Sequence, residues 1–527
     1  MSESLRPWAK PHPYAVEVPS APSSGDPRLT PDVSDHVDEV SLSGADIRGK
    51  AASGVLLISL RTFAIRGLGL VGNLVLARLL SPEEFGVLAF GLTLILFGQF
   101  FADAGIAAGL IRRNQPPTRH ELHAILGFQL LVSSVLMLAI AVVAVPSGRS
   151  GQVATVMATS VVVSAWRAPA TLLLERRLDY RALAAVEVLE GVIFVTASLA
   201  AVALGAGVWG VAGAHVVRAA AGSALMMRKS PVTVLRPTLS MGVVRELLGY
   251  GLAVSARDFV VLVRLQVVNL VTAAVAGLPI LGLYSLADRI MLVPWVVFGS
   301  ILRVTFPAMA RLVSAGEDTR SDLERGLGLL TVSAGSLLAL IAGTAPVLIP
   351  SFFGDRWAPA AEALPLIALG LLLAGPIISV GNGYLYAVGD ARKVLVSTTA
   401  HTVAWLIVAV PLLPSLGVAA VGAGLLAGHV VEGLLLARAV RQRTGLRCYR
   451  ATSAPLLAIV LSGGVGLLVA RGLEPSLLAT LEVSLITAAL LVVGLFLTAR
   501  PTVREGFRLA GRAMPLDRLR RRGAAAT

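Results

Sequence analysis

Cysteine, charge and aromatic side chains are all scarce in this sequence. Cys448 is the only cysteine among 527 residues, which excludes an intramolecular disulfide and a cysteine-based metal cluster. Charged residues make up 14% of the chain and aromatic residues 5%, whereas hydrophobic residues make up 56%. A water-soluble domain cannot bury that much apolar surface. The sequence also has no G-x-x-x-x-G-K-[ST] phosphate-binding loop, which excludes an ATP-driven pump built on that loop.

The apolar residues lie in blocks of about 20, the length that a helix needs to cross the hydrocarbon core of a membrane. When the blocks are divided at glycine, proline and charge clusters, they predict an all-α integral membrane protein with about fourteen transmembrane helices. The expected helices lie near residues 54–77, 86–108, 122–145, 153–174, 183–204, 208–227, 246–276, 280–302, 326–350, 362–388, 395–414, 417–437, 452–470 and 477–498.

Lysine and arginine are unevenly divided between the loops of this arrangement. Six alternate loops hold 21 of these residues, and the seven loops on the opposite side hold only Arg78, Arg149, Arg356 and Arg471. Because basic residues accumulate on the cytoplasmic side of a membrane, both termini are expected in the cytoplasm. The net charge of +14 therefore reflects membrane topology and not a nucleic-acid-binding face.

An internal repeat divides the chain. Residues 54–86 match a second segment at an ungapped offset of 196, with ten identities in 33 positions that include Arg61/Arg257 and Asn73/Asn269. Two homologous six-helix lobes around a central cavity are therefore expected, with two further C-terminal helices. The predicted parts are a disordered cytoplasmic tail (1–50), an N-lobe (51–228), a C-lobe (229–440), an accessory helix pair (441–499) and a basic cytoplasmic tail (500–527).

Several segments resemble polysaccharide and O-antigen flippases of the multidrug/oligosaccharidyl-lipid/polysaccharide exporter superfamily. The first is Leu76-Ala-Arg-Leu-Leu-Ser-Pro-Glu-Glu-Phe-Gly86, followed by Asp103-Ala-Gly-Ile and Arg112-Arg113. The second lobe adds Leu281-Gly-Leu-Tyr-Ser-Leu-Ala-Asp-Arg289, Phe306-Pro-Ala-Met-Ala-Arg311 and Phe353-Gly-Asp-Arg-Trp-Ala-Pro359. The similarity extends from residue 54 to about residue 440.

The resemblance implies a transporter of the bacterial inner membrane that binds no cofactor, and no metal site is expected. An enzyme is not expected either, because a membrane glycosyltransferase or polymerase would need a sizeable extracytoplasmic loop and the longest one here, residues 351–361, has 11 residues. The expected substrate is a polyprenyl-diphosphate-linked oligosaccharide, and a polysaccharide polymerase and glycosyltransferases are expected partners. A flippase for the peptidoglycan lipid precursor and a multidrug exporter of the same superfamily are the alternatives. Arginines inside the membrane favour an anionic lipid over the cations that multidrug exporters carry.

Arginines inside the predicted spans are the main candidates for substrate binding, because a charge near the bilayer centre is costly and is usually functional. A diphosphate requires permanent positive charge with forked hydrogen-bond donors, which guanidinium groups provide. A cytoplasm-side pair and a deeper group are predicted from helical depth: Arg61 and Arg257, then Arg66, Arg264 and Arg289. The alternatives are that the first pair extends to the interface and that the deeper group pairs with Asp103, Asp258 or Asp288 for packing alone.

Other charged residues in the spans are secondary candidates. Arg167, His215 and Arg218 have either a cavity-facing or a packing role, and His215 and Arg218 share a helix face because they are three residues apart. Carboxylates that could couple transport to a proton or sodium ion are Asp103, Asp258, Asp288, Glu190 and Glu432. Salt-bridge partners and helix-end carboxylates are the commoner roles for such residues.

Overall fold

A computed structural model describes residues 65–513 except 66, 70, 104, 107–109, 111–114 and 231–235, and describes residues 250–258, 300–308, 505, 507 and 509–513 by their backbone alone. Within these residues every regular element is a helix, in agreement with the predicted all-α class. The longer helices are α2 (Pro82–Asp103), α4 (Arg119–Ala144), α5 (Arg149–Ala165), α6 (Ala168–Arg176), α7 (Tyr180–Ala203), α8 (Gly207–Lys229), α9 (Met241–Ser314), α10 (Arg320–Phe353), α11 (Ala360–Ala387), α12 (Ala391–Leu416), α13 (Val418–Thr444), α14 (Cys448–Arg471), α15 (Leu477–Thr498) and α16 (Arg500–Ala513). Two short 3-10 turns are η2 (Val145–Ser147) and η3 (Asp355–Trp357).

The predicted all-α membrane fold is confirmed, and a count of about fourteen helices is compatible with the described part of the chain, with local differences. Ten helices in the described part of the chain are long and apolar enough to cross a membrane, or eleven if α5 and α6 form one span bent by 50°. The helices expected near 246–276 and 280–302 are joined in α9, which is interrupted at Gly277, where φ is +83°. Glycine allows this turn because it has no Cβ. Most of the helix expected at 54–77 lies outside the described residues.

The sequence marks where several helices begin. Thr118 and Glu121 form a capping box at the start of α4, because each side chain accepts a hydrogen bond from the backbone of the other residue. The side chains of Asp179 and Ser476 accept hydrogen bonds from Ala182 N and Ala479 N at the starts of α7 and α15. These contacts satisfy N–H groups that have no partner inside the helix.

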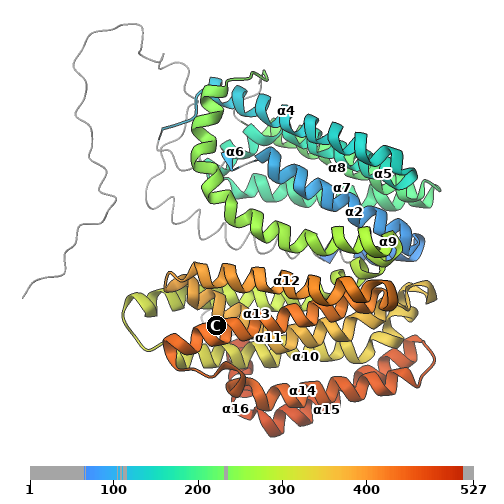
Figure 1. The fold of residues 1–527 in the computed structure, drawn as a ribbon, viewed down its shortest axis with the longest axis vertical. Coiled ribbons are helices and arrows are strands. Elements are labelled where there is room, and N and C mark those ends of the chain that lie inside the picture. The colour runs from blue at the N-terminus through green and yellow to red at the C-terminus, as the bar shows by residue number, and fades with distance from the viewer. Residues whose placement is uncertain are drawn as a thin grey trace, which may run out of the picture.

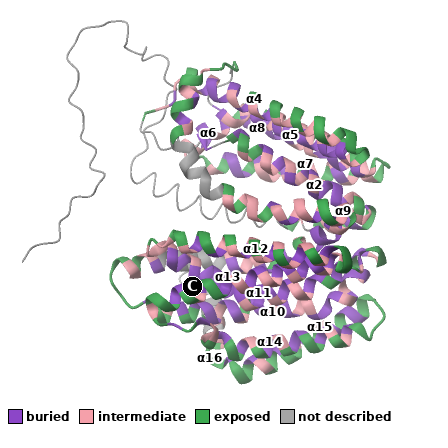
Figure 2. Cartoon of the chain, viewed as in Figure 1, coloured by how far each residue is buried: buried purple, intermediate pink, exposed green. Residues whose placement is uncertain are grey.

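The helices form two groups (Figure 1). The N-terminal group consists of α2, α4–α8 and the first half of α9 (residues 241–277), which lies beside α2. The C-terminal group consists of α10–α16 and the second half of α9. Buried residues concentrate along α11, whereas α14 and α15 have long exposed faces (Figure 2). Those faces carry leucines such as Leu468, Leu478 and Leu497, each more than two thirds exposed, which suits contact with lipid.

Residues related by the repeat make reciprocal contacts where the two groups meet. A Cβ added to Gly86 would lie 1.8 Å from the carbonyl oxygen of Leu278, and a Cβ added to Gly282 would lie 1.7 Å from that of Pro82. Gly282 follows Gly86 by 196 residues, and Leu278 follows Pro82 by the same offset. The two copies therefore exchange the same close backbone contact across a pseudo-twofold axis, and only glycine fits at either position.

A second pair of contacts obeys the same offset of 196 residues. The side chain of Asn269 donates a hydrogen bond to Thr93 over 3.1 Å, and Arg289 donates a hydrogen bond to Asn73. Asn269 corresponds to Asn73, and Arg289 corresponds to Thr93. The first helix of each copy thus packs against the second helix of the other copy, which explains why the asparagine recurs in register.

Candidate functional site between the two helix groups

A close-packed helical hairpin, α12 and α13, positions the most polar cluster of the C-terminal group. The two helices join at Gly417, where φ is +53°. On α13, a Cβ at Gly424 would lie 2.7 Å from Ala409 Cβ, and a Cβ at Gly428 would lie 2.9 Å from the His401 ring. Small residues bring the backbones of membrane helices close together, so the α13 side chains lie directly against those of α12.

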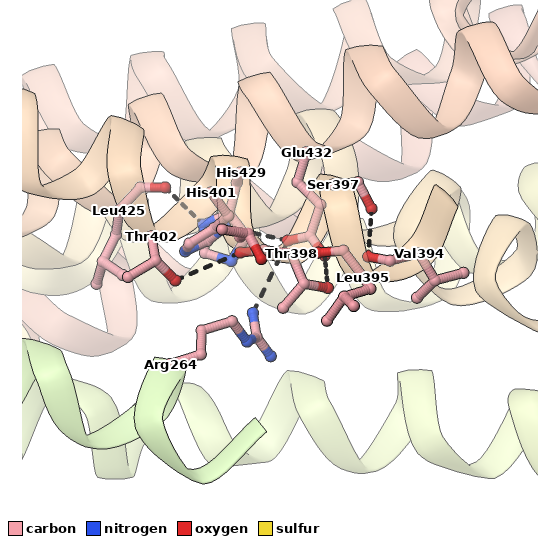
Figure 3. Close-up of polar contacts among 11 residues, drawn as sticks. Arg264, Val394, Leu395, Ser397, Thr398, His401, Thr402, Leu425, His429 and Glu432 are labelled. Atoms are coloured by element: carbon pink, nitrogen blue, oxygen red, sulfur yellow. Dashed lines mark hydrogen bonds and ion pairs between the residues drawn. The ribbon is translucent and has the colours of Figure 1, made fainter. Parts of the chain in front are cut away.

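Glu432 on α13 is the centre of this cluster and is only 2% exposed. Its Oε2 atom lies 3.0 Å from Nδ1 of His401 on α12, and its Oε1 atom accepts a 3.4 Å hydrogen bond from the hydroxyl of Thr398. The ring of His429, one turn before Glu432, meets the His401 ring edge-on with 4.7 Å between the centroids. Figure 3 shows these side chains gathered on the face of the hairpin that is turned toward α9.

Arg264 on α9 extends toward the same carboxylate (Figure 3). Its Nη1 atom lies 3.8 Å from Glu432 Oε2, and its side chain is 24% exposed. The α9 segment around it is held to α2 by a buried polar network in which Thr93 donates to Gln266 over 2.9 Å and Asn269 donates to both. Arg264 therefore projects from a helix fixed on α2 toward a carboxylate of the C-terminal group.

Arg289, the other described arginine of the predicted deeper group, also lies at the contact between the two groups. Its guanidinium lies 4.8 Å from the centre of the Phe85 ring as well as hydrogen bonding to Asn73. The neighbouring Asp288 is exposed. The structure thus brings Arg264 and Arg289 to the same boundary between helix groups, where Arg289 is engaged in packing. Arg61 and Arg66 lie outside the described residues, as do the side chains of Arg257 and Asp258.

The secondary candidates gather elsewhere, inside the N-terminal group. Arg167 donates a hydrogen bond to Glu190, and Arg218 Nε lies 3.6 Å from the other oxygen of that carboxylate. His215 packs against Phe194 with ring centroids 4.5 Å apart. Arg167, Glu190, His215 and Arg218 line a cavity of about 130 Å³, and Arg167 also lines an adjacent cavity of about 350 Å³ that includes Asp103.

Cross-group contacts also close the molecule near the α9 kink. The buried indole of Trp357 donates a 2.7 Å hydrogen bond to the carbonyl oxygen of Ala77 and meets the Phe85 ring edge-on at 5.1 Å. Arg356 donates to the carbonyl oxygens of Ala77 and Arg78, and Arg78 donates to those of Ser351 and Phe352. The loop after α10 is thereby tied to the end of the first helix.

His401 and His429 are the site residues that sequence reasoning missed. A signal for them exists: α8 carries His-Val-Val followed by Arg218, and α13 carries His-Val-Val followed by Glu432. This second repeated motif has an offset of 214 residues, so the offset of 196 found in the first helices does not reveal it. Within the described residues there is no group of three or more histidine, cysteine, aspartate or glutamate side chains placed to hold a metal ion.

Solved structures of transporters share this fold. The inward-closed lipid II flippase MurJ matches with a TM-score of 0.65 and 13% identity over 85% of this chain and 100% of its own. An inward-facing multidrug resistance MATE transporter of the MOP superfamily matches with a TM-score of 0.54 and 18% identity over 74% of this chain and 98% of its own. At these identities the likeness establishes the fold.

Curated relatives are similar in sequence. Lipopolysaccharide biosynthesis protein WzxC of Escherichia coli (strain K12) is 25% identical over 348 residues, which cover 64% of this chain and 69% of that protein. Succinoglycan biosynthesis transport protein ExoT of Rhizobium meliloti (strain 1021) is 25% identical over 334 residues, covering 62% of this chain and 66% of that protein. The matches span about two thirds of the length of each relative.

A family model described as polysaccharide biosynthesis protein matches residues 75–362, which is more than half of the chain. This segment contains the reciprocal contacts of Gly86 and Gly282, the loop with Trp357, and both described arginines at the group boundary. This chain is a multi-pass membrane protein that belongs to the polysaccharide biosynthesis protein family.

Proposed function

We propose that this protein is a flippase that moves polyprenyl-diphosphate-linked oligosaccharide from the cytoplasmic to the outer face of the bacterial inner membrane for surface polysaccharide synthesis. Membership of the polysaccharide biosynthesis family supports this function, as do the names of the two curated relatives. The fold is shared with lipid and multidrug transporters alike, so it supports transport without selecting the substrate.

Arg264 is the observation that carries the proposal. A guanidinium group within a membrane span is costly, and this one lies between two helix groups with part of its surface exposed. One carboxylate at 3.8 Å leaves most of its five N–H donors for another anion. A diphosphate would accept a forked pair of hydrogen bonds from it. Arg289, Arg61, Arg66 and Arg257 are proposed to extend the same cationic path.

The mechanism that we propose is alternating access between the N-terminal and the C-terminal helix groups. Both termini face the cytoplasm in this proposal, as the division of basic residues between loops indicates. The contacts of Trp357, Arg356 and Arg78 then close the outer end, and the headgroup enters from the cytoplasmic side. Glycosyltransferases would supply the lipid-linked unit and a polymerase would consume it.

Single substitutions in a deletion strain test the function. Arg264→Ala is expected to reduce surface polysaccharide by at least about tenfold at normal protein level, because a charge-assisted hydrogen bond is worth roughly 1.5–3 kcal/mol. Arg264→Lys should restore export partly, since the charge stays while the planar fork is lost. Arg325→Ala, which removes an exposed arginine from α10, is the matched control.

Normal export by Arg264→Ala would contradict the proposal. The lipid that accumulates in the deletion strain provides a second measurement, because a polysaccharide repeat unit and the peptidoglycan precursor differ in their sugars. Accumulation of the peptidoglycan precursor would favour the alternative substrate.

A further inference from the structure

Glu432 and His401 form a buried acid–base pair for which the proposed transport function gives no role. Their side chains are 2% and 5% exposed, and Glu432 Oε2 and His401 Nδ1 lie 3.0 Å apart. Neither atom has an aligned hydrogen-bond partner among the described residues. Two buried polar atoms left in this state cost free energy, and a proton shared between them would remove that cost.

The second histidine is fixed in its proton position by the backbone. His429 Nδ1 lies 2.7 Å from the carbonyl oxygen of Leu425, and a carbonyl can only accept, so Nδ1 carries the hydrogen. His401 has no such constraint, because its Nδ1 faces a carboxylate that is either charged or protonated. His429 can take a further proton only at Nε2, whereas the His401–Glu432 pair brings two proton-accepting atoms within 3.0 Å of each other.

Arg264 is the group that competes with a proton for Glu432. At 3.8 Å its contact with Oε2 is too long for a hydrogen bond, and its Nε is buried without an acceptor among the described residues. A phosphate that approached the exposed part of Arg264 would form shorter and stronger hydrogen bonds than this carboxylate does. When the guanidinium turns to the phosphate, Glu432 remains buried without its permanent counter-charge.

We propose that the Glu432–His401 pair binds one proton when Arg264 releases Glu432 to engage the diphosphate of the substrate, so that headgroup binding and proton uptake are linked. This inference rests on the proposed function. The charges balance: neutral His401, Glu432⁻ and Arg264⁺, together with the anionic headgroup and one proton from water, become an Arg264–phosphate pair and a protonated His401–Glu432 pair. No bond other than those to the proton changes.

The surroundings of the pair contain few other charges. Arg264 comes from α9, His429 from α13 itself, and the hydroxyl of Tyr449 on α14 lies near Gly433, one residue after Glu432. The helix α11 faces His429 with Gly370. Among the described side chains, Arg264 is the permanent cation that opposes a proton on the pair, so its withdrawal toward a phosphate favours that proton.

Calorimetric titration of the purified full-length protein in lipid nanodiscs tests the linkage. The probe is a short-chain prenyl-diphospho-N-acetylglucosamine, in which each phosphate has one ester bond and one anhydride bond and therefore does not titrate near neutral pH. Titrations in two buffers of different ionisation enthalpy give the number of protons taken up per ligand, and we expect about one for the wild-type protein. By linkage, affinity should rise by up to about tenfold for each unit of pH decrease across the range where the free pair is unprotonated.

Substitutions of Glu432 and His401 test whether these two residues take up the proton. Glu432→Gln and His401→Gln should each reduce the proton uptake to near zero and flatten the pH profile, and Glu432→Gln should also bind more tightly at high pH because the competing carboxylate is gone. His120→Gln, which removes an exposed histidine from α4, should keep the wild-type profile. A folding role alone would lower protein yield without changing the number of protons per bound ligand.

The outcomes distinguish this inference from the proposed function. Wild-type binding without proton uptake, or uptake unchanged in both Gln variants, overturns the linkage and leaves the flippase function standing. Loss of specific binding to the probe by the wild-type protein, or wild-type affinity in Arg264→Ala, overturns the role of Arg264 in headgroup binding on which the linkage depends. The wild-type measurement decides the question even if both variants fail to fold.

Discussion

Two glutamates with the same degree of burial, Glu190 in the N-terminal group and Glu432 in the C-terminal group, have different partners. Both are 2% exposed. Glu190 is held by Arg167 and Arg218, which belong to its own group and stay charged at every physiological pH. Glu432 is paired with a histidine and with an arginine that projects from α9, the helix held on α2.

Burial alone therefore does not assign a role to a charged residue in a membrane, because these two glutamates are equally buried but differ in their partners. A carboxylate whose partners are permanently charged and move with it stabilises a fold. A carboxylate whose partners titrate or belong to another moving part can change its state during a cycle. By contrast, the two copies are alike where they meet, because Gly86 and Gly282 make matching contacts with backbone carbonyls of the other copy.

The largest effect on stability is expected when the Glu190 cluster is disrupted. Glu190→Gln removes the charge that neutralises Arg167 and Arg218, so the free energy of unfolding should fall by about 3 kcal/mol, the typical loss when one partner of a buried ion pair is removed. Glu432→Gln should cost about 1 kcal/mol, because the glutamine can still accept the hydrogen bond from Thr398 and the Arg264 side chain is partly exposed. Thermal unfolding in detergent, followed by intrinsic fluorescence, measures both. Equal losses in the two variants would remove the distinction between the clusters.

The likeness of the two glycine contacts is tested by Gly86→Ala and Gly282→Ala. Each added Cβ would overlap a backbone carbonyl, and overpacking of this kind costs about 2 kcal/mol. We expect both variants to show faster amide hydrogen exchange at residues 77–86 and 277–286, and to similar extents. Gly213→Ala, where a Cβ would meet no atom within 4 Å, is the control. An effect confined to one of the two variants would contradict the pseudo-twofold contact.

A smaller effect is expected from the loops that follow the third helix of each copy. Trp357→Phe keeps an aromatic ring against Phe85 but removes the hydrogen bond to Ala77, which should cost about 1 kcal/mol. Arg149→Ala in the first copy breaks a 3.7 Å ion pair with Glu84 in which the arginine is 65% exposed, and should cost less than about 0.5 kcal/mol. Thermal unfolding of the two variants measures both losses of stability. A larger loss in Arg149→Ala than in Trp357→Phe would show that the contact of Trp357 with Ala77 is not the stronger one.

The smallest effect is expected at His215. This histidine occupies the same place in the His-Val-Val motif as His429, but it packs on Phe194 and forms no ion pair with a carboxylate among the described residues. His215→Gln should leave the number of protons taken up per bound prenyl-diphospho-sugar unchanged in the calorimetric titration. A reduced proton uptake would extend the linkage to the N-terminal group.

Much of the fold could be predicted because the membrane imposes it. A membrane span must be apolar, about 20 residues long and internally hydrogen bonded, so the helices can be recognised in the sequence. The broken span at Ala165–Ala168 and the continuous α9 were not predicted, since both depend on local backbone geometry between helices. The register of the first repeat was predictable, and the reciprocal contacts of Asn73 and Asn269 follow it.

The types of residue in the candidate site could be predicted, but the contacts between them could not. From the sequence alone it follows that arginines, histidines and carboxylates lie within the predicted membrane spans and that the chain contains two copies of one repeat. Only the tertiary structure decided that Arg264 faces Glu432, that Arg289 hydrogen bonds to Asn73, and that Arg167 and Arg218 share Glu190. Helical periodicity gives the face of a residue, whereas its partner depends on how separate helices pack together.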